Sequence, residues 1–239
     1  MFWLFTMARS IPPERLCRLV EVAAEVFIAQ GYRRTPMDDV ADALGVAKGT
    51  VYACVESKAA LFDAVVSYAD NLELLPGTDT LPLRSPPAGA TLEKLRRRLI
   101  EGAKDLELGR ALKRGRPRDL KAEFSAILRD LYQRLQRYRR TIKIVDRCAI
   151  DQPELAELWF AEGRKKQQDA IAHYLERRQS DGVLRPLPDV QIAARVILET
   201  IVFWAVHRHW DPAPQQLAED KVPDILVDFL FDGLGKEGR

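Results

Sequence analysis

The sequence lacks long apolar stretches. No run approaches the roughly 18 consecutive apolar residues that a membrane-spanning helix needs. The opening heptapeptide MFWLFTM is apolar but only about a third as long as a secretory signal peptide, with no basic residue ahead of it and no small-residue cleavage site after it. Met7 is an alternative start to Met1. We therefore expect no membrane contact and a cytoplasmic location.

Cysteine and histidine are scarce, with three of each. Cys17, Cys54 and Cys148 are odd in number and widely spaced, which argues against a disulfide framework or a zinc ligand set and favours a reducing compartment. His207 and His209 have no cysteine or carboxylate at the usual ligand spacing, so we expect no metal and no cofactor. The sequence also lacks a glycine-rich phosphate loop, a nucleophile elbow and a histidine–carboxylate cluster, which argues against an enzyme.

The composition that remains is that of an ordinary globular protein. Of 239 residues, 47% are hydrophobic and 30% are charged, which allows a substantial core in one or two domains. No segment alternates convincingly in the manner of a strand, whereas apolar residues recur at three- and four-residue steps. We predict an all-α fold with helices at about 13–30, 37–44, 48–55, 58–74, 91–113, 120–148, 153–181, 190–210 and 221–234. Residues 76–90, rich in proline and glycine, predict a linker.

Residues 35–61 (TPMDDVADALGVAKGTVYACVESKAAL) have the spacing of a helix-turn-helix. Two short apolar-periodic runs flank a turn at Gly45, which can take the left-handed conformation. We expect Thr35 to cap the first helix, with Pro36 at its first position and Asp38 completing a capping box. The expected inward residues are Val40, Leu44, Val46, Val51 and Val55. The expected outer face, small and polar enough to enter a DNA groove, holds Lys48, Gly49, Thr50, Tyr52 and Ala53.

Residues 19–62 resemble the TetR-type (tetracycline-repressor family) transcriptional regulators. The matching elements are Ala-Ala-x-x-x-Phe, Gly31-Tyr32, Thr35, Asp39-Val40-Ala41, Gly45-Val46, Gly49-Thr50-Val51-Tyr52 and Ser57-Lys58-x-x-Leu61. The resemblance implies an all-helical homodimer with an N-terminal three-helix DNA-binding domain, here residues 10–57. A C-terminal helical domain for effector binding and dimerisation would follow, here residues 58–239.

The resemblance also assigns DNA-binding residues. Lys48, Gly49, Thr50 and Tyr52 match the recognition-helix positions, and Tyr52 and Lys58 match phosphate contacts. Thr35 and Met37 match the helix end that meets the DNA backbone. Two residues depart from the family pattern: Ala47 stands where a serine or threonine usually caps the recognition helix, and Val55 replaces an inward aromatic residue.

The implied function is a repressor that binds a palindromic operator in double-stranded DNA as a dimer and is released by a small-molecule effector. An activator, or a ligand-independent DNA-binding or interaction protein, remains an alternative.

Residues 190–210 are apolar around the helix circumference and must be buried in a core or against a partner. Together with residues 221–234 they predict a four-helix dimer interface. Candidate effector-pocket residues, with plain core as the alternative, are Phe124, Trp159, Tyr174, Phe203 and Trp204.

Charge is distributed unevenly along the chain. Residues 1–70 carry 7 Lys and Arg against 9 Asp and Glu, whereas residues 91–145 carry 17 against 7. DNA binding by the helix-turn-helix must therefore depend on a few placed contacts. The basic segment is expected to be a solvated surface, a phosphate-facing surface or the site of an acidic effector. Within it, Arg114, Gly115, Arg116 and Pro117 form either a minor-groove hook or a basic interhelix loop.

Overall fold

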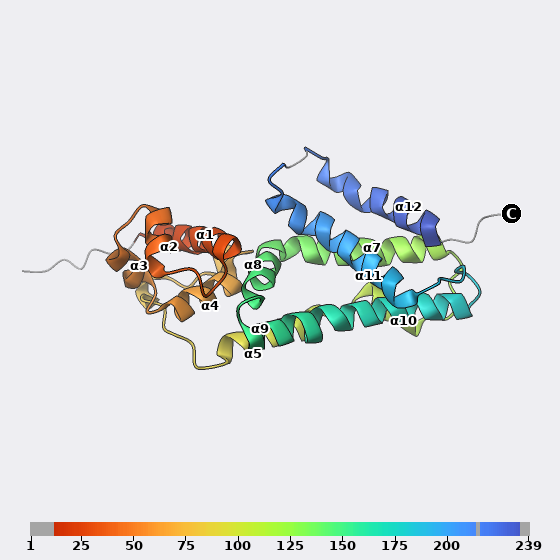
Figure 1. Ribbon diagram of the computed structural model, residues 1–239, viewed down its shortest axis with the longest axis horizontal. Helices are drawn as coiled ribbons and strands as arrows, with labels where there is room; N and C mark the ends of the chain where they lie inside the picture. Colours follow the sequence, from red (N-terminus) through yellow and green to blue (C-terminus); the bar gives the residue numbers. More distant parts are fainter. Residues whose placement is uncertain (1–11, 214–215, 235–239) are drawn as a thin grey trace, which may run out of the picture. The chain divides into compact units, whose positions relative to one another are not determined.

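The computed structural model describes residues 12–213 and 216–234 (Figure 1). Both candidate start sites, Met1 and Met7, lie outside these residues. The all-α prediction is confirmed: the described residues are largely helical and form no β-strand, although isolated bridge residues occur, among them Val55, which pairs with Leu83 in parallel. None of the helices within this part of the chain combines the length and the apolar character that crossing a membrane requires.

The chain divides into two compact units. The first contains the described residues up to Thr91 together with Ile144–Gln152, and the second contains Leu92–Lys143 and the described residues from Pro153 onward. The first unit is larger than the predicted DNA-binding domain of residues 10–57. Three segments account for the difference, because residues 58–75, the linker and the end of a later helix all belong to this unit.

The first unit is built on α1 (Pro13–Gln30), α2 (Met37–Leu44), α3 (Lys48–Cys54) and α4 (Lys58–Tyr68). Two short 3-10 turns follow, η1 (Leu72–Leu74) and η2 (Thr78–Thr80). The core contains Leu19, Phe27, Val51 and Leu61, all with 0% of their surface exposed. Phe27, Tyr32 and Phe62 form a contiguous aromatic group at the end of α1, with ring centroids 4.9 to 6.0 Å apart. Because α1 and α4 both pack into this core, α2 and α3 have a rigid support.

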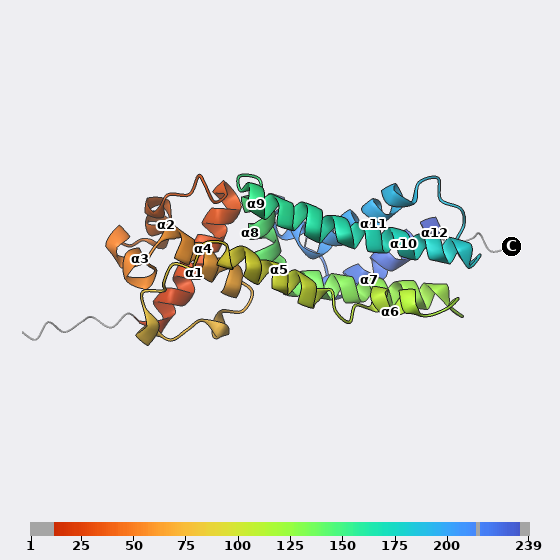
Figure 2. The same cartoon turned by 90° about the horizontal axis from the view of Figure 1, so that it is seen from below.

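The remaining helices lie wholly or partly in the second unit (Figures 1 and 2). They are α5 (Ala90–Gly102), α6 (Glu107–Lys113), α7 (Leu120–Arg137), α8 (Arg139–Ala149), α9 (Pro153–Ala156), the π-helical η3 (Glu157–Lys165), α10 (Lys166–Ser180), α11 (Val190–Ala205), η4 (His207–Trp210), η5 (Glu219–Lys221) and α12 (Val222–Leu234). The helices α5 and α8 each begin in one unit and end in the other. In the core of this unit α11 packs against α10 and α7, and α12 packs against α7.

Four predicted helices are interrupted. The helix predicted at 58–74 ends at Tyr68, and the helix predicted at 190–210 ends at Ala205; a short 3-10 turn follows each of them. The other two are each divided into two α-helices. The helix predicted at 91–113 is interrupted after Gly102, where Asp105 takes a left-handed conformation with φ of 56°. The helix predicted at 120–148 breaks at Tyr138, which has a non-helical backbone and separates α7 from α8. Apolar periodicity continues across both breaks, so the pattern gives no signal for them.

One charged side chain lies in the core of the second unit. Arg178 is 0% exposed, and its Nε donates to Glu123 Oε1 at 2.7 Å, its Nη1 to Asp181 Oδ2 at 2.8 Å and its Nη2 to the Ala111 carbonyl at 2.7 Å. A buried guanidinium is stable only when its donors are satisfied in this way. The network ties α6, α7 and α10 together.

Candidate nucleic-acid interface

The start of α2 differs from the prediction. The helix begins at Met37 with Pro36 as its N-cap, and no side chain caps it. Thr35 is 1% exposed, and its hydroxyl donates to the Gly31 carbonyl at 2.7 Å. The predicted Thr35 cap is therefore wrong, because the hydroxyl finds a backbone acceptor one turn back. The predicted capping box with Asp38 is wrong for the same reason, and Pro36 is the N-cap rather than the first helical residue. The side chains of Thr35 and Met37 are both buried, so a contact of these two residues with DNA would have to use their backbone groups.

The turn and the second helix follow the prediction. Gly45 has φ of 71° and its N–H donates to Asp42 O at 3.0 Å, which ends α2 in the left-handed conformation. Val40, Val51 and Val55 are 0% exposed and Leu44 is 9% exposed, whereas Val46 is half-buried. Ala47 occupies the N-cap position of α3 without a side-chain hydrogen bond, as its lack of a hydroxyl requires.

The outer face of α3 carries the predicted small and polar side chains. Lys48, Gly49 and Ala53 are exposed, Tyr52 is 39% exposed and Thr50 is half-buried. This face has no bulky aliphatic side chain, so it can approach base edges closely in a major groove. The structure thus presents four predicted DNA-binding residues, Lys48, Gly49, Thr50 and Tyr52, on one short helix.

Lys48 is held by an ion pair across the turn. Its Nζ lies 2.9 Å from Asp38 Oδ2, and this hydrogen bond raises the pKa of the Lys48 amine. Both side chains are at least half exposed, so the pair is open to solvent and to competition from an anion such as a phosphate. Because Asp38 lies on α2 and Lys48 lies on α3, this ion pair links the two helices of the motif.

Lys58 lies in a different environment from the open phosphate clamp that its position suggests. Ser57 caps α4 by accepting the Ala60 N–H at 3.1 Å, and Lys58 follows it. The Lys58 amine donates to the Arg33 carbonyl at 3.3 Å and lies 4.6 Å from the centroid of the Tyr32 ring. Burial lowers the pKa of this amine. In this position Lys58 braces the turn between α1 and α2. For Lys58 to contact DNA, its side chain must give up the Arg33 carbonyl and the Tyr32 ring.

The predicted linker contributes a segment that holds the end of α3. In this 83–85 segment, the Leu83 N–H donates to Cys54 O at 2.8 Å and the Glu56 N–H donates to Leu83 O at 2.9 Å. The Ser85 N–H donates to Glu56 Oε2 at 2.7 Å, and this bond lowers the pKa of the Glu56 carboxyl. The segment therefore fixes the passage from α3 to α4 and places the exposed Arg84 beside it. Proline and glycine content predicts a loop here but gives no signal for these contacts.

The end of α8 forms a second brace. Asp151 Oδ2 accepts the Arg33 N–H at 3.0 Å, and Arg147 Nη2 lies 3.2 Å from Gln30 O and 3.4 Å from Ala29 O. Burial raises the pKa of the adjacent Cys148 to about 12, so this thiol stays protonated. Residues more than 115 positions away along the chain thus fix the turn that carries the exposed Arg33 and Arg34.

Replacing Asp151 by alanine should test this brace. The change removes the acceptor of the Arg33 N–H, so we expect the free energy of unfolding to fall by about 1 kcal/mol. We also expect DNA affinity to fall, because the Arg33 and Arg34 turn loses its fixed position. Denaturant titration and fluorescence anisotropy with labelled DNA measure the two effects. The Glu73→Ala variant, which removes an exposed carboxylate from the same unit, serves as the charge control; equal effects in both variants would show that Asp151 acts by charge alone.

The predicted effector-pocket residues occupy different environments in the second unit. Phe124 is a core residue, 6.1 Å from Phe231 between ring centroids. The Tyr174 hydroxyl donates to Glu123 Oε1 at 3.2 Å in the buried Arg178 network. Phe203 is 43% exposed and contacts Trp204 edge to face. Trp159 and Trp204 are half-buried. The effector pocket therefore stays a prediction.

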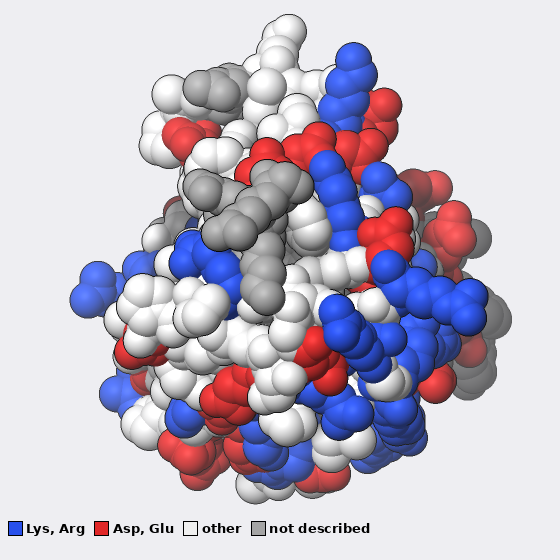
Figure 3. All heavy atoms as spheres, turned by 90° about the vertical axis from the view of Figure 1, so that its right-hand side faces the viewer, with Lys and Arg blue, Asp and Glu red and all other residues white. Residues whose placement is uncertain are grey.

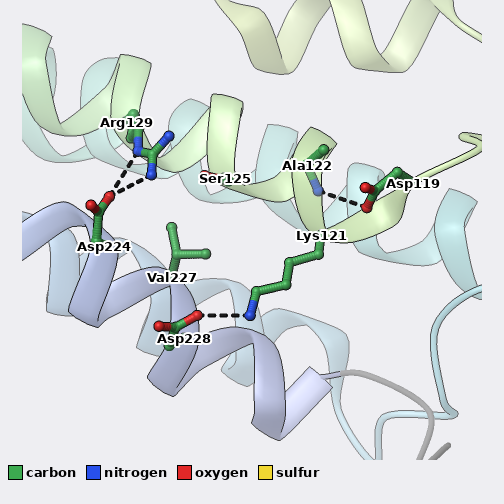
Figure 4. A pocket seen from close by; sticks show the side chains of 8 residues that line it. All are labelled: Asp119, Lys121, Ala122, Ser125, Arg129, Asp224, Val227 and Asp228. Atoms are coloured by element: carbon green, nitrogen blue, oxygen red, sulfur yellow. Dashed lines mark hydrogen bonds and ion pairs between the residues drawn. The ribbon is translucent and has the colours of Figure 1, made fainter.

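A surface groove of about 450 Å³ lies between α7 and α12 (Figure 4). It is bordered by two ion pairs, Lys121 with Asp228 at 2.8 Å and Arg129 Nε with Asp224 Oδ1 at 3.0 Å. Its lining is mostly charged, and none of the five predicted aromatic residues contributes to it. The groove therefore lacks the aromatic walls that are common in sites for small organic ligands.

The basic loop at 113–118 is exposed apart from the half-buried Pro117. Arg114 pairs with Glu107 and has Glu123 at 3.9 Å, so part of its charge is offset. On the face that Figure 3 shows, Lys and Arg are most numerous on the right-hand side, with Asp and Glu among them. A minor-groove role for residues 114–117 stays a hypothesis.

Comparisons with known proteins agree with this architecture. The family model described as bacterial regulatory proteins, tetR family, matches residues 19–65, and the model described as AefR-like transcriptional repressor, C-terminal domain, matches residues 135–232. The HTH-type transcriptional activator FasR of Mycolicibacterium smegmatis is 42% identical over 60 residues, which are 25% of this chain and 27% of that protein. The match thus spans only about a quarter of the relative's length.

Solved structures of regulators share the fold. The ketosteroid transcriptional regulator KstR2 of Mycobacterium tuberculosis is 18% identical, with 95% of this chain and 98% of that chain covered and a TM-score of 0.55. The TetR family regulator PfmR of Thermus thermophilus is 20% identical, with coverage of 93% and 97% and a TM-score of 0.52. At these identities the likeness concerns the fold alone. With family models matched in both its N-terminal and its C-terminal parts, the chain belongs to the TetR family of DNA-binding transcriptional regulators, which are not enzymes.

Proposed function

We propose that this protein is a cytoplasmic repressor that binds a palindromic operator as a homodimer and leaves it when a small-molecule effector binds the second unit. The observation that carries the proposal is the outer face of α3, where Lys48, Thr50 and Tyr52 are presented without bulky neighbours. Side chains of this kind read base edges in the major groove, while nearby cations fix the register on phosphates.

The phosphate contacts are proposed to come from cations around α3. Arg33 and Arg34 are exposed on the braced turn before α2, and Arg84 is exposed beside the start of α4. Lys58 can join them by leaving the Arg33 carbonyl. The position of these few cations, rather than the net charge of residues 1–70, would therefore hold the DNA backbone, and each phosphate contact makes binding more sensitive to salt.

Dimerisation is proposed to use the outward face of α11 and α12. On α11, Ile192 is 63% and Val196 53% exposed, and Phe203 lies on the same face two turns further on. On α12, Ile225 and Phe229 are 63% and 77% exposed and are spaced by one helical turn. Large apolar side chains repeated along one face are typical of a protein interface. A two-fold axis through this face would present two α3 helices to a palindrome.

An activator is the second candidate. The relative FasR, which matches a quarter of this chain, is named an activator. A DNA-reading unit is compatible with either direction of regulation, because the outcome depends on where the operator lies relative to the promoter. Transcription in vitro from a template carrying the selected operator distinguishes the two: lower transcript yield on adding the protein supports the repressor, and a higher yield supports the activator.

Selection of bound DNA from a random pool should test the DNA-binding proposal. We expect the purified full-length chain to enrich a sequence with two inverted half-sites, because a symmetric dimer reads the same bases twice. A thermal-shift screen of small molecules, followed by release of the protein from the enriched DNA, then tests the effector. Enrichment of a single unrepeated site would contradict the dimeric mode, and no enrichment above a protein-free control would contradict sequence-specific binding.

A further inference from the structure

Three parts of the second unit converge on one carboxylate oxygen. Glu219, on η5, has its Oε1 2.8 Å from Arg139 Nη2 at the start of α8. The same oxygen lies 3.3 Å from His209 Nε2 and 3.5 Å from Arg208 Nη2, both on η4. A single carboxylate oxygen thus serves two guanidinium groups and an imidazole.

The cluster carries a surplus of positive charge, because two permanent cations, Arg139 and Arg208, face the single carboxylate of Glu219. A third cation, Lys143, has its Nζ 3.5 Å from Nδ1 of His207, which is on the same element as Arg208. Side chains in the Glu219 cluster are only 14 to 34% exposed, so water screens this charge incompletely. Burial, together with Arg139 and Arg208, lowers the pKa of His209. An additional anion would be attracted to this place more strongly than to an open surface.

Aromatic groups stand beside the cluster. Lys143 Nζ lies 5.9 Å from the centroid of the Trp210 ring, and the His209 and Trp210 rings are 6.4 Å apart, edge to face. The buried Tyr132 lies in the same region. Its hydroxyl donates to the Trp204 carbonyl at 3.5 Å, and burial, together with the charge of Glu219, raises the pKa of that hydroxyl. Cations next to aromatic surface suit a ligand that joins an anionic head to a carbon skeleton.

We propose that Arg139, Arg208 and His209 form a binding site for the carboxylate or phosphate of a small anionic ligand, and that Glu219 occupies this site as a displaceable internal carboxylate. The inference deepens the proposed function by naming the chemical class of effector, and only its link to DNA release rests on that function. Glu219 is the first residue of η5, which leads directly into α12, and α12 carries the exposed Ile225 and Phe229. Displacing Glu219 would therefore free the start of a proposed dimerisation helix.

Replacing Glu219 by glutamine tests the site, because the change removes the competing charge and keeps the side-chain shape. We expect the Glu219→Gln variant to bind octanoate or inorganic pyrophosphate about tenfold or more tightly than the unmodified chain, with no change for neutral octan-1-ol. Titration calorimetry without DNA measures all three probes. Preference for octanoate identifies a carboxylate ligand, and preference for pyrophosphate identifies a phosphate ligand.

Glu162→Gln is the matched control. Glu162 also lies in the second unit, is similarly exposed at 33%, and accepts from Arg96 Nη2 at 3.0 Å. Its neutralisation should leave the affinity for the anionic probes unchanged. An equal gain in both glutamine variants would overturn the proposal, because it would show an effect of net charge alone.

Removal of the cations provides the opposite test. The Arg139→Gln, Arg208→Gln double variant should lose binding of the anionic probes. Arg139→Lys replaces it as the test if the double variant does not fold. That single variant keeps the charge with a shorter reach, so it should bind the probes severalfold more weakly than the unmodified chain. A site that is only a tether for α12 predicts a lower melting temperature in Glu219→Gln without any gain in affinity, and that result would overturn the proposal. Anion binding that fails to release operator DNA would confirm the site and contradict the effector-released repressor.

Discussion

Replacing Lys48 and Tyr52 together by alanine should lower operator affinity by roughly 100-fold or more, since each lost base or phosphate contact costs about 1–3 kcal/mol and a dimer loses it twice. Both side chains point outward from α3, so the fold should remain intact. Fluorescence anisotropy with the selected operator at several salt concentrations measures the loss. Circular dichroism confirms that the variant is folded.

The two residues should contribute differently. Tyr52→Phe removes only a hydroxyl and should weaken binding to all sequences alike, as loss of a phosphate contact does. Lys48→Ala should also change the preferred bases, because Lys48 is at the start of the recognition helix and can leave Asp38 for a base edge. Lys104→Ala, which removes an exposed lysine from the second unit, controls for charge. Tight, salt-dependent binding by the double variant would contradict the assignment of α3 as the recognition helix.

Replacing Ile225 and Phe229 by glutamate should convert the proposed dimer into a monomer. Both side chains are exposed on α12, so the isolated chain tolerates charge there, whereas a self-complementary interface would bring four carboxylates into an apolar contact. Light scattering coupled to size exclusion measures the mass. Operator affinity should fall by about 100-fold or more, since one α3 helix then binds where two bound before.

The Ile100→Glu variant is the control for the interface. Ile100 is 57% exposed on α5, so the substitution adds the same chemistry to a different surface of the second unit. It should leave both the mass and the operator affinity unchanged. A dimeric Ile225→Glu, Phe229→Glu variant would show that another face mediates assembly, and a monomeric unmodified chain would contradict the dimer itself.

Local features of the helix-turn-helix could be predicted because their causes lie within a few residues. Gly45 ends α2 because a left-handed residue is needed there, and Ser57 caps α4 because its hydroxyl reaches the Ala60 N–H. The outward position of Lys48 follows from the helical period once Val51 is buried. Thr35 shows the limit of this reasoning. The sequence pattern predicts that its hydroxyl caps α2, whereas in the folded chain the hydroxyl donates to the Gly31 carbonyl at the end of α1.

Contacts between distant parts of the chain could not be predicted in this way. Asp151 reaches the Arg33 N–H across 118 positions, and Leu83 pairs with Cys54 and Glu56 from a segment whose composition indicates only a loop. The Glu219 cluster joins residues from three helical elements. No periodicity connects such residues, since the path of the chain between them determines their separation.

The sequence by itself determined the helical class, the family and the outer face of the recognition helix, because these depend on short-range periodicity and on a dense local motif. Only the tertiary structure decided how that helix is supported. It placed Lys58 on the α1–α2 turn, drew the 83–85 segment and the end of α8 into the first unit, and gathered Arg139, Arg208 and Glu219 in the second. The physical reason is that hydrogen bonds and ion pairs act over a few ångströms of space, whatever the distance along the chain.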